Sequence, residues 1–320
     1  MKSTPLNIAL AFDRKLYTPF FVVLTSLFDN NKGSTFCIHT IATGVSEEQK
    51  DRITAFVKQN QSEINFYEIT SSHTEGLIVP ENTHLALAAY YRLFFPSLIP
   101  SSITKLLYMD SDIVILDSLK ELYETDLGSY PFGAKTEVNA TKNRPDLGIY
   151  EDYIYFNSGI MLMNIPEWKA QRITEKCIQF IRDYPEKILY MDQDALNVVA
   201  GKNYYRLDSR FNVLPSDIPK DISGKEAQDF LKNKVIMHYT CADYKPWSIF
   251  SIHPYNYIYK AYFNKSPQSH EKMITDIKIT PRFVMRLAYS RIKRPLVRRF
   301  PTIGQKLKVV MHSLVLLLDI

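Results

Sequence analysis

Short apolar runs alternate with segments of helical periodicity from residue 6 to residue 245, and this alternation constrains the fold more than any other feature. The apolar runs have the length and the Ile, Leu and Val content of buried strands. Ser46 and Gln49 form a capping box that predicts the start of a helix. The pattern predicts an α/β fold in which helices cover a parallel or mixed sheet.

Strands and helices are predicted along the whole of this stretch, and no linker rich in Gly, Pro and Ser divides it. We therefore expect one α/β domain over residues 1–250 and a helical, basic C-terminal segment over residues 251–320. The predicted strands are LNIALAF (6–12), TFCIHTIA (35–42), INFYEI (64–69), KLLYMD (105–110), IVIL (113–116), YPFGAK (130–135) and SGIMLMNI (158–165). The predicted helices are FFVVLTSLFDN (20–30), EEQKDRITAFVKQ (47–59), HLALAAYYRLFF (84–95), SLKELYE (118–124) and WKAQRITEKCIQFIRDY (168–184).

The C-terminal segment carries all of the positive excess of the chain. The sequence has 39 Lys and Arg against 34 Asp and Glu, but residues 278–308 hold ten basic residues and no acidic one. Basic and apolar side chains interleave there, as in segments that lie in the interface of an anionic membrane. We expect the segment to bind an anionic membrane surface. A structural helix is one alternative, and nucleic-acid binding is another, for which the sequence shows no recognition motif.

The compartment is indicated by the cysteines and by the apolar runs. Cys37, Cys177 and Cys241 show neither a CxxC spacing nor an even framework, which predicts reduced thiols. The first apolar run is too short for the core of a signal peptide, and no run reaches the ~18 apolar residues of a membrane span. We expect a cytoplasmic protein that is peripheral on the inner face of the cytoplasmic membrane.

Two aspartates stand in the middle of the apolar run LLYMDSDIVI (106–115). Successive side chains of an extended segment point to opposite faces, so Asp110 and Asp112 share one face and Ser111 lies on the other. Open α/β sheets bind ligands at the carboxyl ends of their strands, and carboxylates suit Mg²⁺ or Mn²⁺ whose shell a substrate diphosphate completes. The alternative is that Asp112 caps a turn and Asp110 pairs with a base.

Seven separated blocks give this aspartate pair a context. They are NIALAFD, AAYYRL, KLLYMDSDIVILDSLKELYETDL, YFNSGIMLMNIPEW, MDQDALN, SRFNVLP and MHYTCADYKPW. In these blocks, which span most of residues 6–247, the chain resembles the retaining glycosyltransferases of family 8, among them bacterial lipopolysaccharide galactosyl- and glucosyltransferases and glycogenin. The resemblance implies a single Rossmann-like nucleotide-sugar-binding domain of the GT-A type with a mixed central sheet. It also implies Mn²⁺ or Mg²⁺ as cofactor, and transfer of galactose or glucose from a UDP-sugar to a glycan or glycolipid acceptor such as the lipopolysaccharide core.

The resemblance implies the positions of the metal and of the donor. Asp110, Asp112 and His238 would be the three protein ligands of the metal. The implied donor-binding residues are Asp13, Ala11 and Ser111 at the uridine, Tyr90, Arg92 and Lys245 at the diphosphate, and Asn157, Ser158, Gly159, Asp192 and Gln193 at the sugar. Taken singly, Asp13 and the N-S-G run are also ordinary turn residues, Arg92 an ordinary surface arginine, and His238 an ordinary core histidine.

The catalytic residues are implied in the run MDQDALN (191–197). Gln193 would lie on the β face of the anomeric carbon, where a nucleophile for double displacement has to sit. An amide oxygen is a poor nucleophile, and Asp194 has the better chemistry if it lies close enough. We therefore favour attack by the acceptor hydroxyl on the face that UDP leaves. Asp192 and Asp194 also have an ordinary explanation as acids in the first turn of a helix, and Glu137 is expected to touch the acceptor.

Three other classes of protein remain open. The chain departs from the family at Thr240, Cys241 and Ala242, where many members have a Gly, so a protein that binds UDP-sugar without turnover is possible. A metal-dependent sugar nucleotidyl- or phosphotransferase would also use paired aspartates, although no Gly-rich phosphate loop supports it. A self-glucosylating primer needs an acceptor tyrosine, and the chain has 21 tyrosines.

Overall fold

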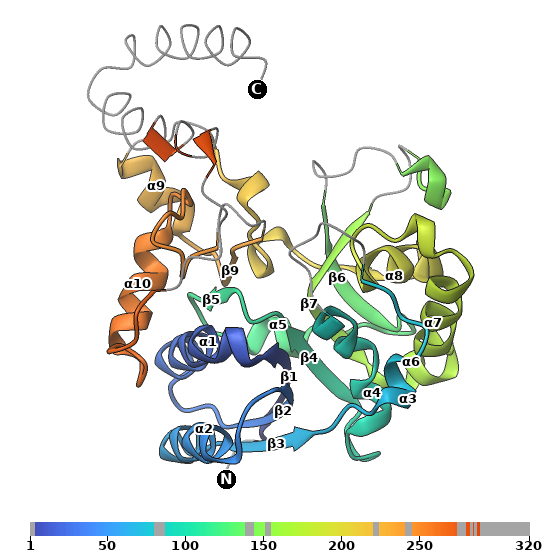
Figure 1. Cartoon of the computed structure of the whole chain (residues 1–320), viewed down its shortest axis with the longest axis horizontal. Coiled ribbons are helices and arrows are strands. Elements are labelled where there is room, and N and C mark those ends of the chain that lie inside the picture. The colour runs from blue at the N-terminus through green and yellow to red at the C-terminus, as the bar shows by residue number, and fades with distance from the viewer. Residues whose placement is uncertain are drawn as a thin grey trace, which may run out of the picture.

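The protein is built on a seven-stranded sheet and a separate two-stranded sheet (Figure 1). The computed structural model describes residues 4–79, 87–137, 144–150, 155–219, 224–240 and 245–273, together with positions 280, 281, 284, 287 and 288. The large sheet has the order β3-β2-β1-β4-β7-β6-β8. Its strands are β1 (Leu6–Asp13), β2 (Phe36–Thr43), β3 (Glu63–Tyr67), β4 (Lys105–Met109), β6 (Phe132–Thr136), β7 (Phe156–Asn164) and β8 (Tyr205–Arg206), and β5 (Ile113–Ile115) pairs with β9 (Ile236–His238).

The predicted α/β fold with a mixed sheet is confirmed. Strands β3, β2, β1 and β4 run parallel to one another. Strand β7 then runs antiparallel to both β4 and β6. The first residues of β7 therefore lie at the same edge of the sheet as the last residues of β4, where Asp110 N–H donates to the Gly159 carbonyl at 2.8 Å.

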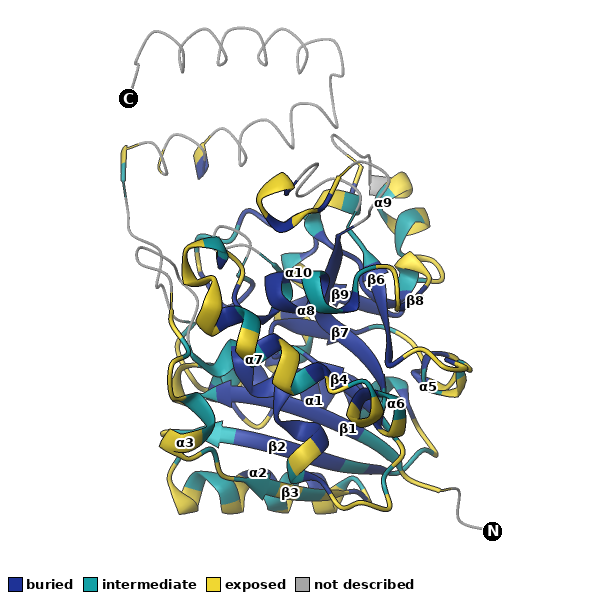
Figure 2. Cartoon of the chain, turned by 90° about the vertical axis from the view of Figure 1, so that its right-hand side faces the viewer, coloured by how far each residue is buried: buried dark blue, intermediate teal, exposed yellow. Residues whose placement is uncertain are grey.

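Helices cover both faces of the sheet, and Figure 2 shows the central strands buried and the outer faces of the helices exposed. The helices are α1 (Tyr17–Asn30), α2 (Glu47–Gln59), α3 (Ser71–Thr74), α4 (Phe95–Leu98), α5 (Lys120–Glu124), α6 (Ile165–Ala170), α7 (Ile173–Asp183), α8 (Asp192–Ala200), α9 (Gly224–Leu231) and α10 (Asn256–Lys265), with 3₁₀ helices that include η1 (Arg14–Leu16), η2 (Leu87–Leu93) and η5 (Ser209–Phe211). The predicted capping box of α2 is present, with Gln49 N–H donating to Ser46 Oγ and Ser46 N–H to Gln49 Oε1.

The two faces of β1 contribute to different parts of the core. Ile8 and Phe12 point toward α1 and α2 and pack with their apolar side chains. Ala9 and Ala11 point to the other face, where they pack with the aromatic residues of η2. Because alanine is short, η2 lies close to the sheet, and this placement brings its last turn toward the end of β4.

Two predicted helices differ from the structure. The run 84–95 is not one α-helix: its described part forms the 3₁₀ helix η2, followed by α4. Pro96, at the start of α4, has no N–H to donate to the Arg92 carbonyl, so an α-helix cannot continue from η2 into α4. The run 168–184 divides into α6 and α7, because Arg172 adopts a left-handed conformation with φ 55°. Neither Gly nor Pro marks that break, so the sequence carried no signal for it.

Residues beyond 250 pack against the α/β domain. Tyr259 and Phe263 of α10 share a core cluster with Val114 and Met237 of the β5–β9 pair. Asn30 Nδ2 in α1 donates to the hydroxyl of Tyr262 at 2.7 Å, and Figure 1 shows α10 beside α1.

No helix in the described part of the chain is long and apolar enough to cross a membrane. Most of the basic segment 278–320, to which membrane association was assigned, lies outside the described residues.

The buried His39 in β2 should make the folded protein less stable in acid. Its Nδ1 lies 2.8 Å from the Tyr67 hydroxyl and its Nε2 lies 3.2 Å from Asn7 Oδ1, and burial lowers its pKa from 6.5 to about 4. Between pH 6.5 and about pH 4, the unfolded chain binds a proton at this histidine that the folded chain does not bind. The free energy of unfolding therefore falls as the pH falls. Between about pH 7 and about pH 5, we expect the free energy of unfolding from urea denaturation to fall by about 2 kcal/mol more in the wild type than in His39→Gln. An equal loss in both proteins would contradict this account.

Candidate active site

Asp110, Asp112 and His238 meet at the carboxyl end of β4. One ligand atom from each lies within 4.8 Å of the others. His238 Nε2 is 3.1 Å from Asp112 Oδ1 and 3.7 Å from Asp110 Oδ2. The antiparallel β5–β9 pair causes this meeting, because it aligns Ile113 with His238. The histidine thus reaches an aspartate that lies 126 positions away in the sequence.

Arg92 is the buried counter-ion of this cluster. Its guanidinium donates from NH2 to Asp110 Oδ1 at 3.0 Å. Its Nε, which donates to the Ala89 carbonyl at 3.1 Å, lies 2.9 Å from Asp192 Oδ2 and forms an ion pair with that carboxylate. It also lies over the ring of Tyr108, 4.6 Å from the centroid, and the Tyr108 hydroxyl donates to Asp110 at 2.8 Å. Burial alone would lower the pKa of Arg92, but Asp110 and Asp192 raise it above its usual value. Tyr90 lies buried on the same 3₁₀ helix.

Lys245 is the second cation, and it pairs with Asp112 Oδ2. Burial alone would raise the pKa of Asp112, but Lys245 and His238 outweigh it and hold that pKa well below its usual range. Asp112 is therefore a carboxylate, which is the form that a metal binds. Cys241 and Ala242, where the chain departs from the family pattern, lie outside the described residues.

Asp192 is brought to Arg92 by an unusual turn. Met191, just before α8, has φ 54°, and a non-glycine residue held there costs on the order of 1–3 kcal/mol. The carboxylate of Asp192 also accepts from Ser158 Oγ at 2.9 Å. Burial raises the pKa of Asp192 to about 7, with Arg92 lowering it and Asp110 raising it. The strained turn therefore holds a buried acid between Arg92 and β7.

The N-S-G run at the start of β7 joins the cluster to α8. Ser158 N–H donates to Gln193 Oε1 at 3.0 Å, and Asn157 Nδ2 donates to the same oxygen at 3.2 Å. Gly159 N–H donates to Asn157 Oδ1 at 3.0 Å. The Ser158 carbonyl accepts from Arg92. The residues predicted to hold the donor sugar therefore form one connected edge beside the candidate metal-binding cluster of Asp110, Asp112 and His238 (the metal cluster).

Asp194 is fully buried and accepts four hydrogen bonds. Oδ1 accepts from Arg144 at 2.8 Å and from the Tyr155 hydroxyl at 2.6 Å. Oδ2 accepts from the N–H groups of Leu189 and Tyr190, both at 2.7 Å. These donors match the roughly four acceptor positions of a carboxylate. The contacts of Asp194 in this structure thus hold the turns around Arg144 and Tyr190 to the start of α8.

The residues assigned to the uridine lie at the same edge of the sheet. Strand β1, which ends at Asp13, is the neighbour of β4. Ser111 Oγ donates to the carbonyl of Ala11 at 3.2 Å, so the ends of the two strands are joined. The carboxylate of Asp13 accepts from Lys15 N–H at 2.9 Å and caps η1.

Glu137 lies at the other side of the N-S-G run. It follows β6, and the side chain of Asn157 is among the groups that lower its pKa. Burial raises the pKa of Glu137, although Lys135 and His238 lower it. Lys135, on the same strand, is buried and pairs with Asp217. The residue assigned to the acceptor thus lies near the edge assigned to the donor sugar.

The cluster fits a divalent cation. Two carboxylates and one imidazole are ligands that suit Mn²⁺ or Mg²⁺, and within the described residues no other group of three such side chains lies as close together. Space for the ligands depends on Gly159: an added Cβ would lie 2.2 Å from His238 Cε1 and 2.7 Å from Asp110 Oδ2. Only glycine at this position leaves the cluster intact.

The sequence missed two residues of the site. Tyr108 stands two positions before Asp110 and therefore on the same face of the strand, which was a usable signal. Asn212 stands in the block SRFNVLP, and it contacts both His238 and Asn157 at 2.9 Å. No spacing or composition distinguishes this asparagine from others in the chain.

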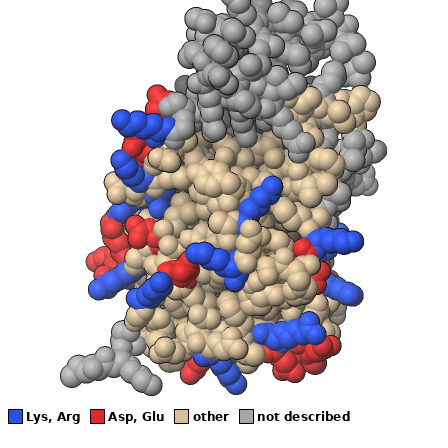
Figure 3. Space-filling view, turned by 90° about the vertical axis from the view of Figure 1, so that its left-hand side faces the viewer, with Lys and Arg blue, Asp and Glu red and all other residues tan. Residues whose placement is uncertain are grey.

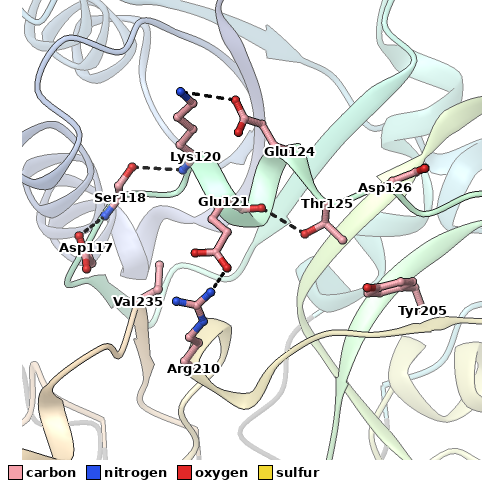
Figure 4. Close-up of a pocket in the computed structure, with 10 residues that line it drawn as sticks. All are labelled: Asp117, Ser118, Lys120, Glu121, Glu124, Thr125, Asp126, Tyr205, Arg210 and Val235. Atoms are coloured by element: carbon pink, nitrogen blue, oxygen red, sulfur yellow. Dashed lines mark hydrogen bonds and ion pairs between the residues drawn. The ribbon is translucent and has the colours of Figure 1, made fainter.

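A separate pocket of about 620 Å³ opens at the other end of β9 from His238 (Figure 4). Its charged side chains are largely paired with one another, including Arg210 with Glu121 and Lys120 with Glu124. It does not include any residue of the metal cluster. The residues that line it are Asp117, Ser118, Lys120, Glu121, Glu124, Thr125, Asp126, Tyr205, Arg210 and Val235.

The matching family model and the related sequences indicate one protein family. The sequence model of glycosyl transferase family 8 matches residues 7–250. General stress protein A of Bacillus subtilis (strain 168) is 30% identical over 236 residues, which is 71% of this chain and 82% of that protein. A lipopolysaccharide 1,2-glucosyltransferase of Escherichia coli is 27% identical over 270 residues, 82% of this chain and 78% of that protein.

A solved structure shares the fold. The galactosyltransferase LgtC, in complex with donor and acceptor sugar analogs, superposes with a TM-score of 0.70 at 21% identity. The match covers 88% of this chain and 100% of that chain.

The space around Gly159 gives a test of the metal site. In Gly159→Ala the new methyl group must displace His238 from Asp110, so we expect the affinity for Mn²⁺, measured by isothermal titration calorimetry, to fall by about tenfold or more. Gly133→Ala is the matched control: it lies on β6 of the same sheet, and the atoms nearest to its Cβ belong to the side chains of Leu127 and Leu207, outside the metal site. Unchanged affinity in Gly159→Ala would show that the cation binds elsewhere.

Proposed function

The chain belongs to glycosyl transferase family 8, and from this membership we propose that it is a metal-dependent, retaining glycosyltransferase that moves glucose or galactose from a UDP-sugar to a bacterial cell-surface glycan such as the lipopolysaccharide core. The choice of sugar and acceptor is supported by the relative named lipopolysaccharide 1,2-glucosyltransferase and by the galactosyltransferase fold. The donor site is the edge of the sheet formed by the ends of β1 and β4 and the start of β7, as in other GT-A-type domains.

The observation that carries the proposal is the meeting of Asp110, Asp112 and His238 beside two cations. A divalent cation held by these three side chains would act as a Lewis acid on the leaving diphosphate. Arg92 and Lys245 place positive charge on either side of the same position, where the departing UDP gains negative charge. Lys245 exchanges its contact with Asp112 for a phosphate oxygen when the donor binds.

The hydrogen bonds of Gln193 support attack on the face that UDP leaves. Its amide oxygen accepts from Ser158 N–H and from Asn157 Nδ2, so it is engaged and is not free to attack the anomeric carbon. The acceptor hydroxyl attacks instead, and a β-phosphate oxygen of the departing UDP accepts its proton. The carboxylate of Asp192 and the amide of Asn157 hold the sugar hydroxyls, and Glu137 orients the acceptor.

Release of UDP tests the reaction. We expect UDP to be released from UDP-glucose or UDP-galactose in the presence of Mn²⁺ and a lipid-linked glycan acceptor, and the release to stop when the metal is chelated. In Asp112→Asn a neutral amide replaces a metal-binding carboxylate, and we expect the rate to fall by about 100-fold or more. Asp117→Asn, five positions further on and exposed, is the control that should keep full activity.

The products also separate the proposal from its alternatives. A nucleotidyl- or phosphotransferase would release pyrophosphate or a phosphosugar instead of UDP. A protein that only binds the donor would show Mn²⁺-dependent binding of UDP-sugar without any release. Full activity of Asp112→Asn would refute the assignment of the metal ligand.

The C-terminal segment is proposed to hold the enzyme at the anionic inner surface of the cytoplasmic membrane. Figure 3 shows acidic and basic side chains interspersed over the described part of one face of the protein. Residues 278–308, by contrast, hold ten basic residues and no acidic one. Each basic group near an anionic surface contributes about 1 kcal/mol, so about half of them suffice for attachment.

Two truncations test where the catalytic part ends. Deleting residues 278–320 should abolish co-sedimentation with vesicles that contain anionic lipid, and it should leave the release of UDP from the UDP-sugar unchanged when the acceptor is soluble. Ending the chain after residue 250 also removes Tyr259 and Phe263 from the core cluster that contains Val114, and we expect the loss of cooperative thermal unfolding. Undiminished vesicle binding by the first truncation would refute the membrane role.

A further inference from the structure

Asn212 is a buried side chain that links the metal cluster to the sugar edge. It follows η5 and is fully buried. Its Nδ2 donates to Asn157 Oδ1 at 2.9 Å, and its Oδ1 lies 2.9 Å from His238 Nδ1. The next residue, Val213, forms a parallel bridge with Met237, so the chain at Asn212 is aligned beside β9. The side chain is thus held from both sides by the backbone.

The direction of these hydrogen bonds is fixed by two backbone N–H groups. An N–H can only donate, so Gly159 N–H identifies its partner on Asn157 as the amide oxygen. Independently, Ser158 N–H identifies its partner on Gln193 as an oxygen. Asn157 must then present its NH₂ group to Gln193, which agrees with the first assignment. The orientation of the Asn157 amide follows from the backbone alone.

The same logic extends to His238. Because Asn157 offers an oxygen, Asn212 must present its NH₂ group to it and turn its own oxygen toward His238. An oxygen beside Nδ1 requires that Nδ1 carries the proton. We propose that Asn212 is a positioning residue that keeps the His238 proton on Nδ1 and thereby leaves the Nε2 lone pair as the metal ligand, directed at Asp112 and Asp110.

This arrangement is directed toward a cation. With the proton held on Nδ1, the lone pair of Nε2 faces Asp112 Oδ1 at 3.1 Å and Asp110 Oδ2 at 3.7 Å. A lone pair opposite carboxylate oxygens is repulsive unless a positive charge lies between them, which is a second proton on Nε2 when no metal is bound and the divalent cation when it replaces that proton. The inference rests on the proposed metal dependence, and it adds that a neutral asparagine, not a metal-binding group, sets the geometry of the third ligand. Partners of this kind commonly change metal affinity by about 10–100-fold when they are lost.

Three variants test the role of Asn212 by Mn²⁺ affinity, measured by isothermal titration calorimetry without any donor. Asn212→Leu removes the acceptor for His238 Nδ1, and we expect about 10–100-fold weaker binding. Asn212→Asp keeps an acceptor for that proton and should bind Mn²⁺ as tightly as the wild type. Asn31→Leu is the matched control, because Asn31 is a buried asparagine with two hydrogen bonds outside the site, to the Leu27 carbonyl and from Leu119 N–H; its Mn²⁺ affinity should not change.

Asn212→Asp has a second expected effect. A carboxylate cannot donate to the oxygen of Asn157, so the sugar edge loosens while the metal ligand stays in place. We expect a raised KM for the UDP-sugar at unchanged Mn²⁺ affinity. A purely structural role for Asn212 would instead weaken Mn²⁺ binding equally in Asn212→Asp and Asn212→Leu, and that result would overturn the proposal.

The proton itself can be observed in the wild-type protein. Spectra of ¹⁵N-histidine-labelled protein, with the His238 signals assigned by difference against His238→Gln, report which ring nitrogens carry a proton. We expect a proton on Nδ1 both without metal and with diamagnetic Mg²⁺. A neutral ring that carries its proton on Nε2 would overturn the proposal, even if Asn212→Leu failed to fold. If the wild type bound no cation at all while Nδ1 kept its proton, the proposed metal dependence would fail and the assignment of the proton would stand.

Discussion

The antiparallel pairing of β7 with β4 is the constraint on which the site depends. In a purely parallel sheet every strand would begin at the edge opposite to the metal cluster. Because β7 runs against β4, its first residues lie beside the last residues of β4, where Asp110 N–H bonds the Gly159 carbonyl. The carboxylates at the end of one strand and the N-S-G run at the start of the next therefore share one edge. The two-stranded β5–β9 sheet adds His238 to the same edge by a second antiparallel pairing.

The sequence predicted much of this arrangement because its signals are local. Periodicity and the capping box of α2 identified the α/β fold, and the one-face rule for alternate residues put Asp110 and Asp112 together. The joining of His238 to them was implied only by the resemblance, since it depends on a pairing between β5 and β9 that no local pattern encodes. The breaks at Pro96 and Arg172 show the same contrast. A proline marks the first break in the sequence, whereas no Gly or Pro marks the second, at the left-handed Arg172.

Asn212 and Asp194 show why roles are harder to predict than positions. Both are polar residues in recognisable blocks, yet their functions follow from partners on other elements. Asp194 follows Gln193 in the sequence, which made it a candidate for catalysis. In the structure its carboxylate accepts from Arg144 and from the turn before α8, so it supports the loop around that turn. Asn212 owes its importance to the direction of its hydrogen bonds, which two backbone N–H groups of β7 determine. A linear sequence carries no information on such direction.

In the proposed reaction, the charge balance of the cluster would let the site distinguish the departing UDP from the intact donor. Asp110 and Asp192 share Arg92, and Asp112 pairs with Lys245. The diphosphate of a UDP-sugar carries two negative charges, so together with one divalent cation it would enter the site as a neutral unit and would leave this balance nearly unchanged. When the bond to the sugar breaks in the proposed reaction, UDP would gain a further negative charge beside Arg92 and Lys245. Interactions that strengthen only as this charge develops lower the barrier without tightening the binding of the donor.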